Sequence, residues 1–530
     1  MRRTKGKAKN KAPHSALLLS TENSRRLDRE AAEKWNFNEF ALVEAAGRRC
    51  ADTLFENCRG LFKEGLKITA AAGAGNNGAD AMVMLRHWIL SGRVKPEFSA
   101  LVLSRSPKDD EKAPWAELSR SLEKMKVPVC LWGEDRCKSA ESFFVESDIV
   151  IDGITGTGLS GPLRGAALEM ASAINSADRP IIVSVDLPSG NFDGWKKGTA
   201  IIKADFTLAV EPQKICLYNP AARPYAGTIY PVGGIFPDGL IAAYKGAEIL
   251  DWERQRKRIP KIKSEAYKNE RGTVQIRAGS HGATGAAIIA SRGAQAAGAG
   301  LVRLVADDDI YPILASACAG IMVASESSTE SFDGRFKPDA ILLGPGWGAK
   351  QTRMAVLEKA LVQEKNGVPL VLDADAIELA AGKTFNGNAI LTPHPLEFSR
   401  FSGLEKEEVL CSPAAPLLAC AKKCNAVIIF KSHVPFIAAP DGRLGVLDGM
   451  KAVLASGGSG DLLAGFCAAI IARAIAAGAY DLYDCAAAAA SLFLRAGRSK
   501  KLANRFFDPT ELADIAADLA GRAWLPGSCQ

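Results

Sequence analysis

The sequence predicts an α/β protein built as two tandem three-layer domains, and three observations lead to that prediction. The chain has 530 residues, more than one hydrophobic core usually organises, and 48% of them are hydrophobic, an ordinary share for a globular protein. Short runs rich in β-branched residues alternate with helical stretches, which is typical of parallel sheets covered on both faces. This alternation stops once, at a charged segment, and then resumes.

The runs that we expect to be strands fall into two groups along the chain. They are LKITAA (66–71), ALVLS (100–104), SDIVID (147–152) and IIVSVDL (181–187), and later GTVQIRAG (272–279), KPDAILLG (337–344), VPLVLDAD (368–375), NAILTPH (388–394) and NAVIIFK (425–431). Ligands of open parallel sheets bind beyond the carboxyl ends of the strands. The residues that follow each run are therefore the candidates for function.

The interruption lies at 251–272, where DWERQRKRIPKIKSEAYKNERG is charged, poor in apolar residues and broken by a proline. We place a charged linker at 246–265, between a first domain at 15–245 and a second domain at 266–525. Residues 1–14 are expected to form a disordered basic tail.

Charge and cysteine content exclude several classes of protein. The net charge is +7, but six positive charges belong to the tail: Arg2, Arg3, Lys5, Lys7, Lys9 and Lys11. The remaining chain is close to neutral, so we expect no nucleic-acid partner, and no apolar run is long and uninterrupted enough to predict a membrane span. The twelve cysteines form no CxxC pair, which favours a reducing compartment, the cytoplasm, over a disulfide framework or a zinc site.

A glycine-rich segment, ASGGSGDLLAG (455–465), is the strongest motif of the second half. Gly457, Gly458 and Gly460 allow several backbone N–H groups to point at one anion, and the helix that follows adds the positive end of its dipole. Asp461 could simply cap that helix. Because a carboxylate beside a bound phosphate is repelled, we favour a second interpretation, in which Asp461 takes a proton from the hydroxyl that attacks the phosphate.

The GGSGD segment resembles the GxGD signature of ribokinase-like folds, and the second half is similar to ADP-dependent NAD(P)H-hydrate dehydratases over about 265–500. The motifs that carry the resemblance occur in register: AGSHGATGAAIIASRGAQAAGAGLVRL, LLGPGWG, VLDADAIEL, LTPHPLEFSRFSG, IIFKS and ASGGSGDLLAGF. The resemblance implies ADP-driven dehydration of the S hydrate of NADH or NADPH, with release of AMP and phosphate and with magnesium as a cofactor.

By position, the same resemblance assigns Asp461 as the catalytic base. The hydrate would contact Ala286, Gly346, His394, Pro395, Leu396, Glu397, Phe398, Ser399, Arg400 and Asp461, and the nucleotide would contact Lys431, Ser432, His433, Gly457, Gly458, Ser459 and Gly460. The sequence departs from the family at Ala283, Leu396 and Ser432. From the residues alone, His394 could be a hydrogen-bonded structural residue, and Asp373 and Asp375 could be caps or magnesium ligands.

In the first half, ITAAAGAGNNGADAM places Gly73, Gly75 and Gly78 in a GxGxxG frame between a strand and a helix. The acidic residue that would bind a ribose is missing from the end of the next strand, which argues against a dehydrogenase. Oxygen-bearing side chains instead follow successive strands: Asn76, Asn77, Asp80, Asp152, Asp186 and Ser189. Such ligands suit an alkali or alkaline-earth cation.

These residues resemble the signatures GNNGGDG, DxxFGTG and VDIPSG of the NAD(P)H-hydrate epimerase domain, a Rossmann-like fold. The similarity extends over about 19–234 and includes LVEAAGRR (42–49). It implies that Asn77, Asp152 and Ser189 bind potassium and that Asp186 is the catalytic acid or base. The hydrate would contact Asn76, Asn77, Gly78, Ala79, Asp80, Gly156, Thr157, Gly158, Leu159, Ser160, Gly161, Pro162 and Asp186.

Both domains in this order form the pattern of the bifunctional NAD(P)H-hydrate repair enzymes. The signature of this chain is GNNGADA, with Ala79 and Ala81 at positions where the family has glycine. The alternative function is a ribokinase-like small-molecule kinase with a non-catalytic N-terminal binding module. We expect small-molecule substrates, no membrane and a homo-oligomer, although the alanine-rich helix at 486–497 could pack against another subunit or against its own sheet.

Overall fold

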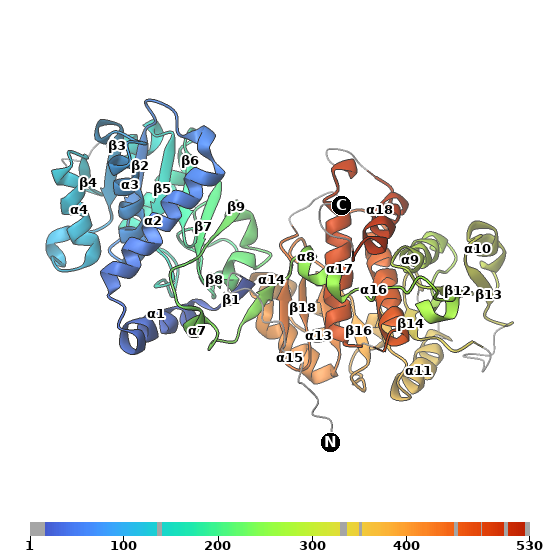
Figure 1. Cartoon of the computed structure of the whole chain (residues 1–530). Coiled ribbons are helices and arrows are strands. Elements are labelled where there is room, and N and C mark those ends of the chain that lie inside the picture. The colour runs from blue at the N-terminus through green and yellow to red at the C-terminus, as the bar shows by residue number, and fades with distance from the viewer. Residues whose placement is uncertain are drawn as a thin grey trace, which may run out of the picture. The chain divides into compact units, whose positions relative to one another are not determined.

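The computed structural model of the chain describes residues 16–134, 140–328, 336–348, 352–449, 454–478, 480–502 and 507–524. These residues form two units, Met1–Glu248 and Ile249–Gln530, each with its own α/β core (Figure 1). The predicted fold class is confirmed. The predicted basic tail at 1–14 lies outside the described residues, and the predicted domain boundaries stay predictions.

Unit 1 contains a parallel sheet in the order β4-β3-β2-β5-β6-β7-β9. Its strands are β2 (Ile68–Ala72), β3 (Ser99–Leu103), β4 (Val129–Leu131), β5 (Ile149–Gly153), β6 (Ile181–Val185), β7 (Phe206–Val210) and β9 (Thr228–Val232). Alternate residues of β2 face opposite sides: Ala70 and Ala72 belong to one hydrophobic cluster and Ala71 to another. This alternation explains why the central strands read as continuous apolar runs.

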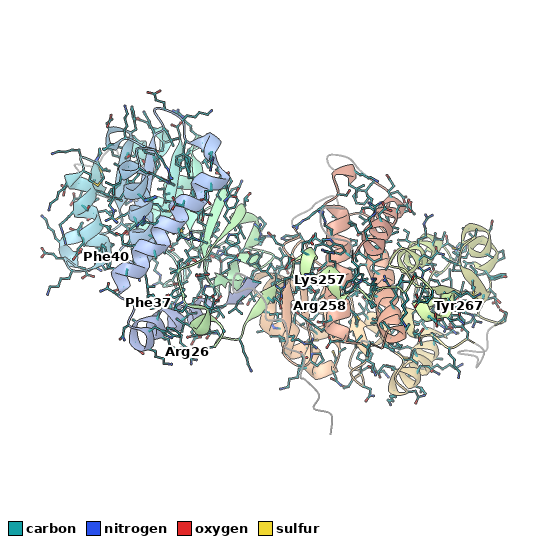
Figure 2. The ribbon with its side chains drawn as sticks, viewed as in Figure 1. Arg26, Phe37, Phe40, Lys257, Arg258 and Tyr267 are labelled. Carbon is teal, nitrogen blue, oxygen red and sulfur yellow. The ribbon has the colours of Figure 1, made fainter. Side chains whose placement is uncertain are left out.

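Helices cover both faces of this sheet, as the sequence predicts. The helices are α1 (Thr21–Trp35), α2 (Glu39–Asn57), α3 (Asn76–Leu90), α4 (Pro114–Lys124), α5 (Ala140–Glu146), α6 (Gly165–Ser176) and α7 (Asp238–Ile241). The cluster on one face takes residues from α2, α3 and α4, and the cluster on the other takes residues from α5 and α6. Phe37 and Phe40, labelled in Figure 2, hold the turn between α1 and α2 by packing against two different clusters.

Three short strands complete unit 1. β1 (Leu17–Leu19) pairs in parallel with β8 (Gln213–Lys214) and antiparallel with β10 (Ala247–Ile249). This pairing fixes the chain just before α1, and Ser20 then caps that helix by accepting from the Asn23 N–H at 3.1 Å.

Unit 2 contains a sheet in the order β13-β12-β11-β14-β15-β16-β17-β18-β19, parallel as far as β17 and antiparallel beyond it. Its strands are β11 (Thr273–Arg277), β12 (Leu301–Ala306), β13 (Met322–Ser325), β14 (Ala340–Leu343), β15 (Leu370–Leu372), β16 (Ala389–Leu391), β17 (Val427–Phe430), β18 (Phe436–Ala438) and β19 (Leu444–Val446). All five runs predicted as strands in this half contain one.

The helices of unit 2 are α8 (Trp252–Gln255), α9 (Thr284–Ala296), α10 (Tyr311–Ala317), α11 (Thr352–Lys365), α12 (Asp375–Leu379), α13 (Pro395–Ser402), α14 (Lys406–Cys411), α15 (Ala414–Cys424), α16 (Ser459–Ala476), α17 (Leu482–Gly497) and α18 (Pro509–Gly521). α9, α16, α17 and α18 lie close together (Figure 1), and their apolar residues share one large cluster with the sheet. In the described part of the chain, α16 alone has the length and composition to cross a membrane, and 72% of it is buried inside the fold, as in a core helix.

Candidate active sites

A cavity of about 760 Å³ lies in unit 1, beyond the carboxyl ends of its strands. Nine residues predicted to bind the hydrate line it: Asn76, Asn77, Gly78, Asp80, Gly156, Thr157, Gly158, Leu159 and Asp186. The other four, Ala79, Ser160, Gly161 and Pro162, are not among its lining residues. The predicted loops therefore meet at one cavity, although not every residue of each motif reaches it.

The start of α3 forms one wall of this cavity. Gly75 caps the helix with an extended backbone and no side-chain hydrogen bond, so the first N–H groups of α3 face the cavity without a capping oxygen. A methyl group on Gly78 would lie 2.9 Å from the backbone nitrogen of Gly73, which explains the glycine at that position. This wall can bind an anionic group.

The alanines that depart from the family signature lie inside α3. The Ala79 N–H donates to the Gly75 carbonyl at 3.0 Å, and neither Ala79 nor Ala81 has a positive φ. Both are fully buried. The Ala81 methyl group packs against Gly153 of β5. Neither alanine therefore strains the backbone, and Ala79 does not narrow the cavity.

Two of the three residues predicted to bind potassium, Asn77 and Ser189, contact Thr155, and the third, Asp152, contacts Ser189. Asn77 Nδ2 donates to the Thr155 carbonyl at 2.8 Å, and the Ser189 hydroxyl accepts from the Thr155 N–H at 2.8 Å. Asp152 is fully buried and accepts from the Ser189 hydroxyl at 2.5 Å and from the Ser189 N–H at 2.9 Å. The Thr155 carbonyl, the Ser189 hydroxyl and the Asp152 carboxylate thus bring oxygen atoms together, a donor set that fits a hard monovalent cation, while Asn77 directs its amide nitrogen at Thr155.

Asp186 follows β6 and forms a buried ion pair that no sequence motif predicts. Its Oδ1 lies 2.6 Å from Nζ of Lys214, and the two side chains are 10% and 4% exposed. Asp186 has a φ of 62°, a left-handed conformation that is unfavourable for a residue other than glycine and is concentrated at functional sites. Asp186 lines the cavity, as predicted.

Two more carboxyl groups surround this pair. Burial, together with the charges of Asp186 and Asp28, raises the pKa of Asp80 well above its ordinary value. Asp28 lines the cavity. Surrounding protein atoms exclude water from its carboxyl group and raise its pKa to about 6. Arg25 of α1 donates to the Thr157 carbonyl at 2.8 Å and ties that helix to the predicted loop at 156–162.

In unit 2, the predicted anion site lies at the start of α16. Gly458 is the cap residue, with a φ of 86°, and a methyl group there would lie 2.5 Å from Cδ1 of Ile289. Asp461 is the third residue of the helix, so the interpretation of Asp461 as its N-cap is wrong. The buried Ser456 hydroxyl finds no hydrogen-bond partner in the described part of the chain. Uncapped N–H groups and this hydroxyl together suit a phosphate.

Lys431, at the end of β17, brings the charged groups of this site together. Its Nζ lies 2.5 Å from Oδ1 of Asp373 and 3.9 Å from Oε2 of Glu397. A methyl group on Gly460 would lie 3.2 Å from that nitrogen, so Lys431 reaches the glycine loop. Burial lowers the pKa of Lys431, but the three neighbouring carboxylates together raise it above its ordinary value. Lys431 is therefore a fixed cation.

Asp461 is the carboxylate that this cation compensates least. Burial, and then the charge of Asp373, raise the pKa of Asp461 to about 7, against the lowering effect of Lys431. Among the described residues nothing donates a hydrogen bond to its side chain. A carboxyl group with a pKa near neutrality is suited to take up and release a proton.

His394 has a structural role in the predicted hydrate site. It caps α13, and its Nδ1 accepts from the N–H groups of Leu396 at 3.1 Å and Glu397 at 3.2 Å, while the Glu397 carboxylate accepts from the His394 N–H at 2.7 Å. Burial and the charge of Lys431 lower the pKa of His394, which keeps Nδ1 an acceptor. Leu396 points outward with 46% of its surface exposed.

The loop after β14 lies against α9. Gly346 has a φ of 60°, and a methyl group there would lie 2.7 Å from Cβ of Ala286 and 2.9 Å from the Ala283 carbonyl. Asp375 accepts from the Gly348 N–H at 2.8 Å. Gly346 and Ala286, predicted to contact the hydrate, are thus neighbours, and Asp375 holds the loop rather than capping α12.

Several residues predicted to contact the hydrate or the nucleotide have side chains that contact other residues of unit 2 instead. Phe398 is fully buried and packs edge-on against Phe430, with ring centroids 5.7 Å apart. The Ser399 hydroxyl donates to the Leu404 carbonyl at 2.7 Å, the Ser432 hydroxyl donates to the Val434 carbonyl at 2.6 Å, and Arg400 pairs with Glu378. Pro395 begins α13, Ser459 begins α16, and the His433 backbone contacts Gly449. These residues shape the site through their backbone.

Comparisons with known proteins point to one family over both units. A family model described as NAD(P)H-hydrate dehydratase matches residues 274–518, and a model described as YjeF-related protein N-terminus matches residues 39–216. The chain is 30% identical over 466 residues to the bifunctional NAD(P)H-hydrate repair enzyme Nnr of Thermofilum pendens, covering 84% of this chain and 85% of that protein.

A second curated relative agrees with this match, and one solved structure is also similar. The enzyme of the same name from Coxiella burnetii is 27% identical, covering 86% of this chain and 90% of that protein. The solved structure of an ADP/ATP-dependent NAD(P)H-hydrate dehydratase from Bacillus subtilis, co-crystallized with ATP and Mg²⁺, is 25% identical, with a TM-score of 0.46, covering 52% of this chain and 99% of that chain.

Proposed function

Because the chain belongs to the family of bifunctional NAD(P)H-hydrate repair enzymes, we propose that it restores hydrated NADH and NADPH in two steps. Unit 1 interconverts the R and S hydrates. Unit 2 dehydrates the S hydrate at the expense of ADP and releases AMP and phosphate. The alternative, a small-molecule kinase with a non-catalytic first domain, is not favoured, because relatives of the same name match across both units.

The observation that carries the dehydratase proposal is the position of Asp461 beside Lys431 and the glycine loop. Asp461 takes the proton of the hydrate hydroxyl while that oxygen bonds to the terminal phosphorus of ADP and the bond to AMP breaks. The N–H groups at the start of α16 and the ammonium of Lys431 stabilise the charge on the phosphoryl group. Phosphate then leaves the hydrate carbon, and loss of a proton from the neighbouring carbon restores the double bond.

Magnesium would accompany the nucleotide, because this ion is usually held by phosphate oxygens and one or two carboxylates. Asp373 accepts from Lys431 and from the Thr392 hydroxyl at 2.7 Å, and Asp375 accepts from Gly348. Asp461 must remain free to take the hydroxyl proton, so Asp373 and Asp375 would hold the ion.

In unit 1, the donor set around Thr155 would hold potassium through Asn77, Asp152 and Ser189. The ion would fix the loop at 156–162 against the start of α3. When bound, the ion would supply positive charge next to the hydrate, and Asp186 would exchange protons with the hydrate. A cytoplasmic location and a homo-oligomer also remain proposals. Ten described cysteines, all free, are consistent with a reducing compartment.

One assay tests both halves. The full chain is given a mixture of R and S hydrates of NADH with ADP and magnesium, and the absorbance of NADH is followed together with AMP and phosphate. We expect complete recovery of NADH, faster than spontaneous epimerisation allows, with one AMP and one phosphate for each NADH. Recovery that stops at the S fraction would refute the epimerase proposal, and phosphate that stays on an organic product would favour the kinase.

A further inference from the structure

Lys214 is a buried cation in the unit 1 cavity for which neither motif nor family signature supplies a role. It ends β8 and lines the cavity. Its Nζ donates to Oδ1 of Asp186 at 2.6 Å and to the Val210 carbonyl at 3.0 Å. An ammonium group has three N–H donors. The contacts made with the described residues therefore leave one donor for a molecule in the cavity.

The surroundings distinguish this pair from an ion pair that only stabilises the fold. Asp186 is held in a left-handed backbone conformation, with a φ of 62°, at the edge of the cavity. Asp80 is 8% exposed and lines the same cavity, and its Oδ1 has no hydrogen-bond partner among the described residues. An unpartnered buried carboxyl oxygen is costly unless a ligand uses it.

The proposed epimerisation requires a proton acceptor and a proton donor at the two atoms attached to the inverted carbon, its hydroxyl oxygen and its ring nitrogen. Water added to the double bond beside the ring nitrogen leaves a hydroxyl on a carbon that also carries that nitrogen. Inversion at this carbon is possible if the carbon–nitrogen bond breaks and forms again on the opposite face. One group must then take the hydroxyl proton while another supplies a proton to the nitrogen.

We propose that Lys214 is the catalytic acid of this step and that Asp186 is its base, an inference that rests on the epimerase function proposed above. Asp186 takes the hydroxyl proton, and the O–H electron pair forms the carbonyl bond. The electron pair of the breaking carbon–nitrogen bond goes to nitrogen, which receives a proton from Lys214. Rotation exposes the other face of the carbonyl, and the reverse transfers close the ring, so no oxidant or reductant is needed.

Asp80 completes this assignment. Burial raises the pKa of Asp80 well above its ordinary value, which favours the neutral, protonated form of its carboxyl group, and that form can donate a hydrogen bond. The titratable groups that interact with the pair from neighbouring elements are Asp28 of α1, Cys50 of α2, Asp80 of α3 and Cys216, which follows β8. Arg29, Glu39 and Glu211 also line the cavity. A neutral Asp80 can thus hold the carbonyl oxygen of the opened ring without adding a negative charge to the cavity.

The first test replaces Lys214 with arginine in the full chain. Lys214→Arg keeps the positive charge, but a guanidinium group does not release its proton near neutral pH. With the R hydrate and ADP, NADH recovery depends on epimerisation. We expect kcat for this recovery to fall by about 100-fold or more, with KM within about threefold of the wild-type value. A variant that keeps kcat within about threefold would overturn the assignment.

The second test does not depend on how well an arginine fits. Lys214→Ala is assayed with methylamine and with fluorinated ethylamines of lower basicity. We expect added amine to restore epimerisation, with a rate that follows the pKa of the amine, which a purely structural cavity filler would not produce. Rescue that is equal for all amines, or no rescue in a variant that melts like the wild type, would contradict proton donation.

Two controls separate this inference from the proposed function. Lys67→Met removes an exposed lysine of unit 1 that lies 3.3 Å from Glu146, and it should epimerise like the wild type. Dehydration of the pure S hydrate should be unchanged in every variant. If the wild-type chain does not accelerate R hydrate recovery, the epimerase proposal itself is wrong. If the wild-type chain accelerates this recovery and Lys214→Arg recovers NADH at the same rate, only the role of Lys214 is wrong.

Discussion

The ammonium of Lys431 lies 2.5 Å from Oδ1 of Asp373, so its charge is directed at that carboxylate rather than at Asp461. Asp461 therefore receives only part of the compensation that its burial demands, and its pKa rises to about 7. This relationship makes Asp461 a base that is poised near neutral pH. It also links the activity of unit 2 to pH and to the charge of Lys431.

Dehydration should depend on the ionisation of Asp461. Because the carboxylate is the active form, kcat at saturating ADP should rise about tenfold per pH unit below about pH 7 and level off above it. Lys431 lowers the pKa of Asp461, so Lys431→Met should move the rise of kcat with pH to higher pH. A kcat that is constant from about pH 5.5 to about pH 8 would show that Asp461 is not the base.

Gly458→Ala should weaken nucleotide binding. The φ of 86° is strained for alanine by roughly 1 kcal/mol or more, and the added methyl group would lie 2.5 Å from Ile289, so the glycine loop must move. We expect KM for ADP to rise about tenfold or more. Gly521→Ala, in a position with nothing within 4 Å, is the matched control. An unchanged KM in Gly458→Ala would remove this loop from the nucleotide site.

Restoring the family glycines in α3 should not improve the enzyme. Ala79 and Ala81 are helical and buried, so Ala79→Gly and Ala81→Gly should each destabilise unit 1 by roughly 0.5–1 kcal/mol. Thermal unfolding measures this loss, and R hydrate recovery should stay near the wild-type rate. A clear gain in epimerisation would mean that the alanines restrict the cavity after all.

Epimerisation should require potassium. Replacing potassium with tetramethylammonium, which is too large for the oxygen donors around Thr155, should slow R hydrate recovery about tenfold or more. Dehydration of the S hydrate, measured in the same buffers, corrects for any general effect of salt. Equal rates of epimerisation in both salts would show that Asn77, Asp152 and Ser189 form a purely structural network.

Much of the active-site architecture of unit 2 could be predicted from the sequence. Glycines followed by an aspartate before a long apolar run indicate a helix start, and Asp461 indeed lies in the first turn of α16. The same logic placed Asp186 after β6. These positions follow from local rules, because the carboxyl ends of parallel strands share one edge of a sheet.

Contacts between distant segments could not be predicted in this way. Lys214 lies in EPQKICLYNP, where no spacing or repeat distinguishes it, and its role emerges only when β8 brings it to Asp186. The sequence around Asp28 predicts an amphipathic helix and does not indicate that Asp28 lines a cavity. The backbone angles of Ala79 and Ala81 likewise depend on where α3 begins, which a glycine-rich sequence leaves open.

Dehydration of the pure S hydrate by Asp461→Asn tests most directly whether Asp461 is the base. We expect kcat to fall by about 100-fold or more while ADP still binds and unit 2 still folds, because asparagine keeps the shape of the side chain but cannot accept the proton. Asp514→Asn, at a side chain that is 75% exposed on α18, should act like the wild type. Near-normal turnover of Asp461→Asn would show that Asp461 is not the base of dehydration.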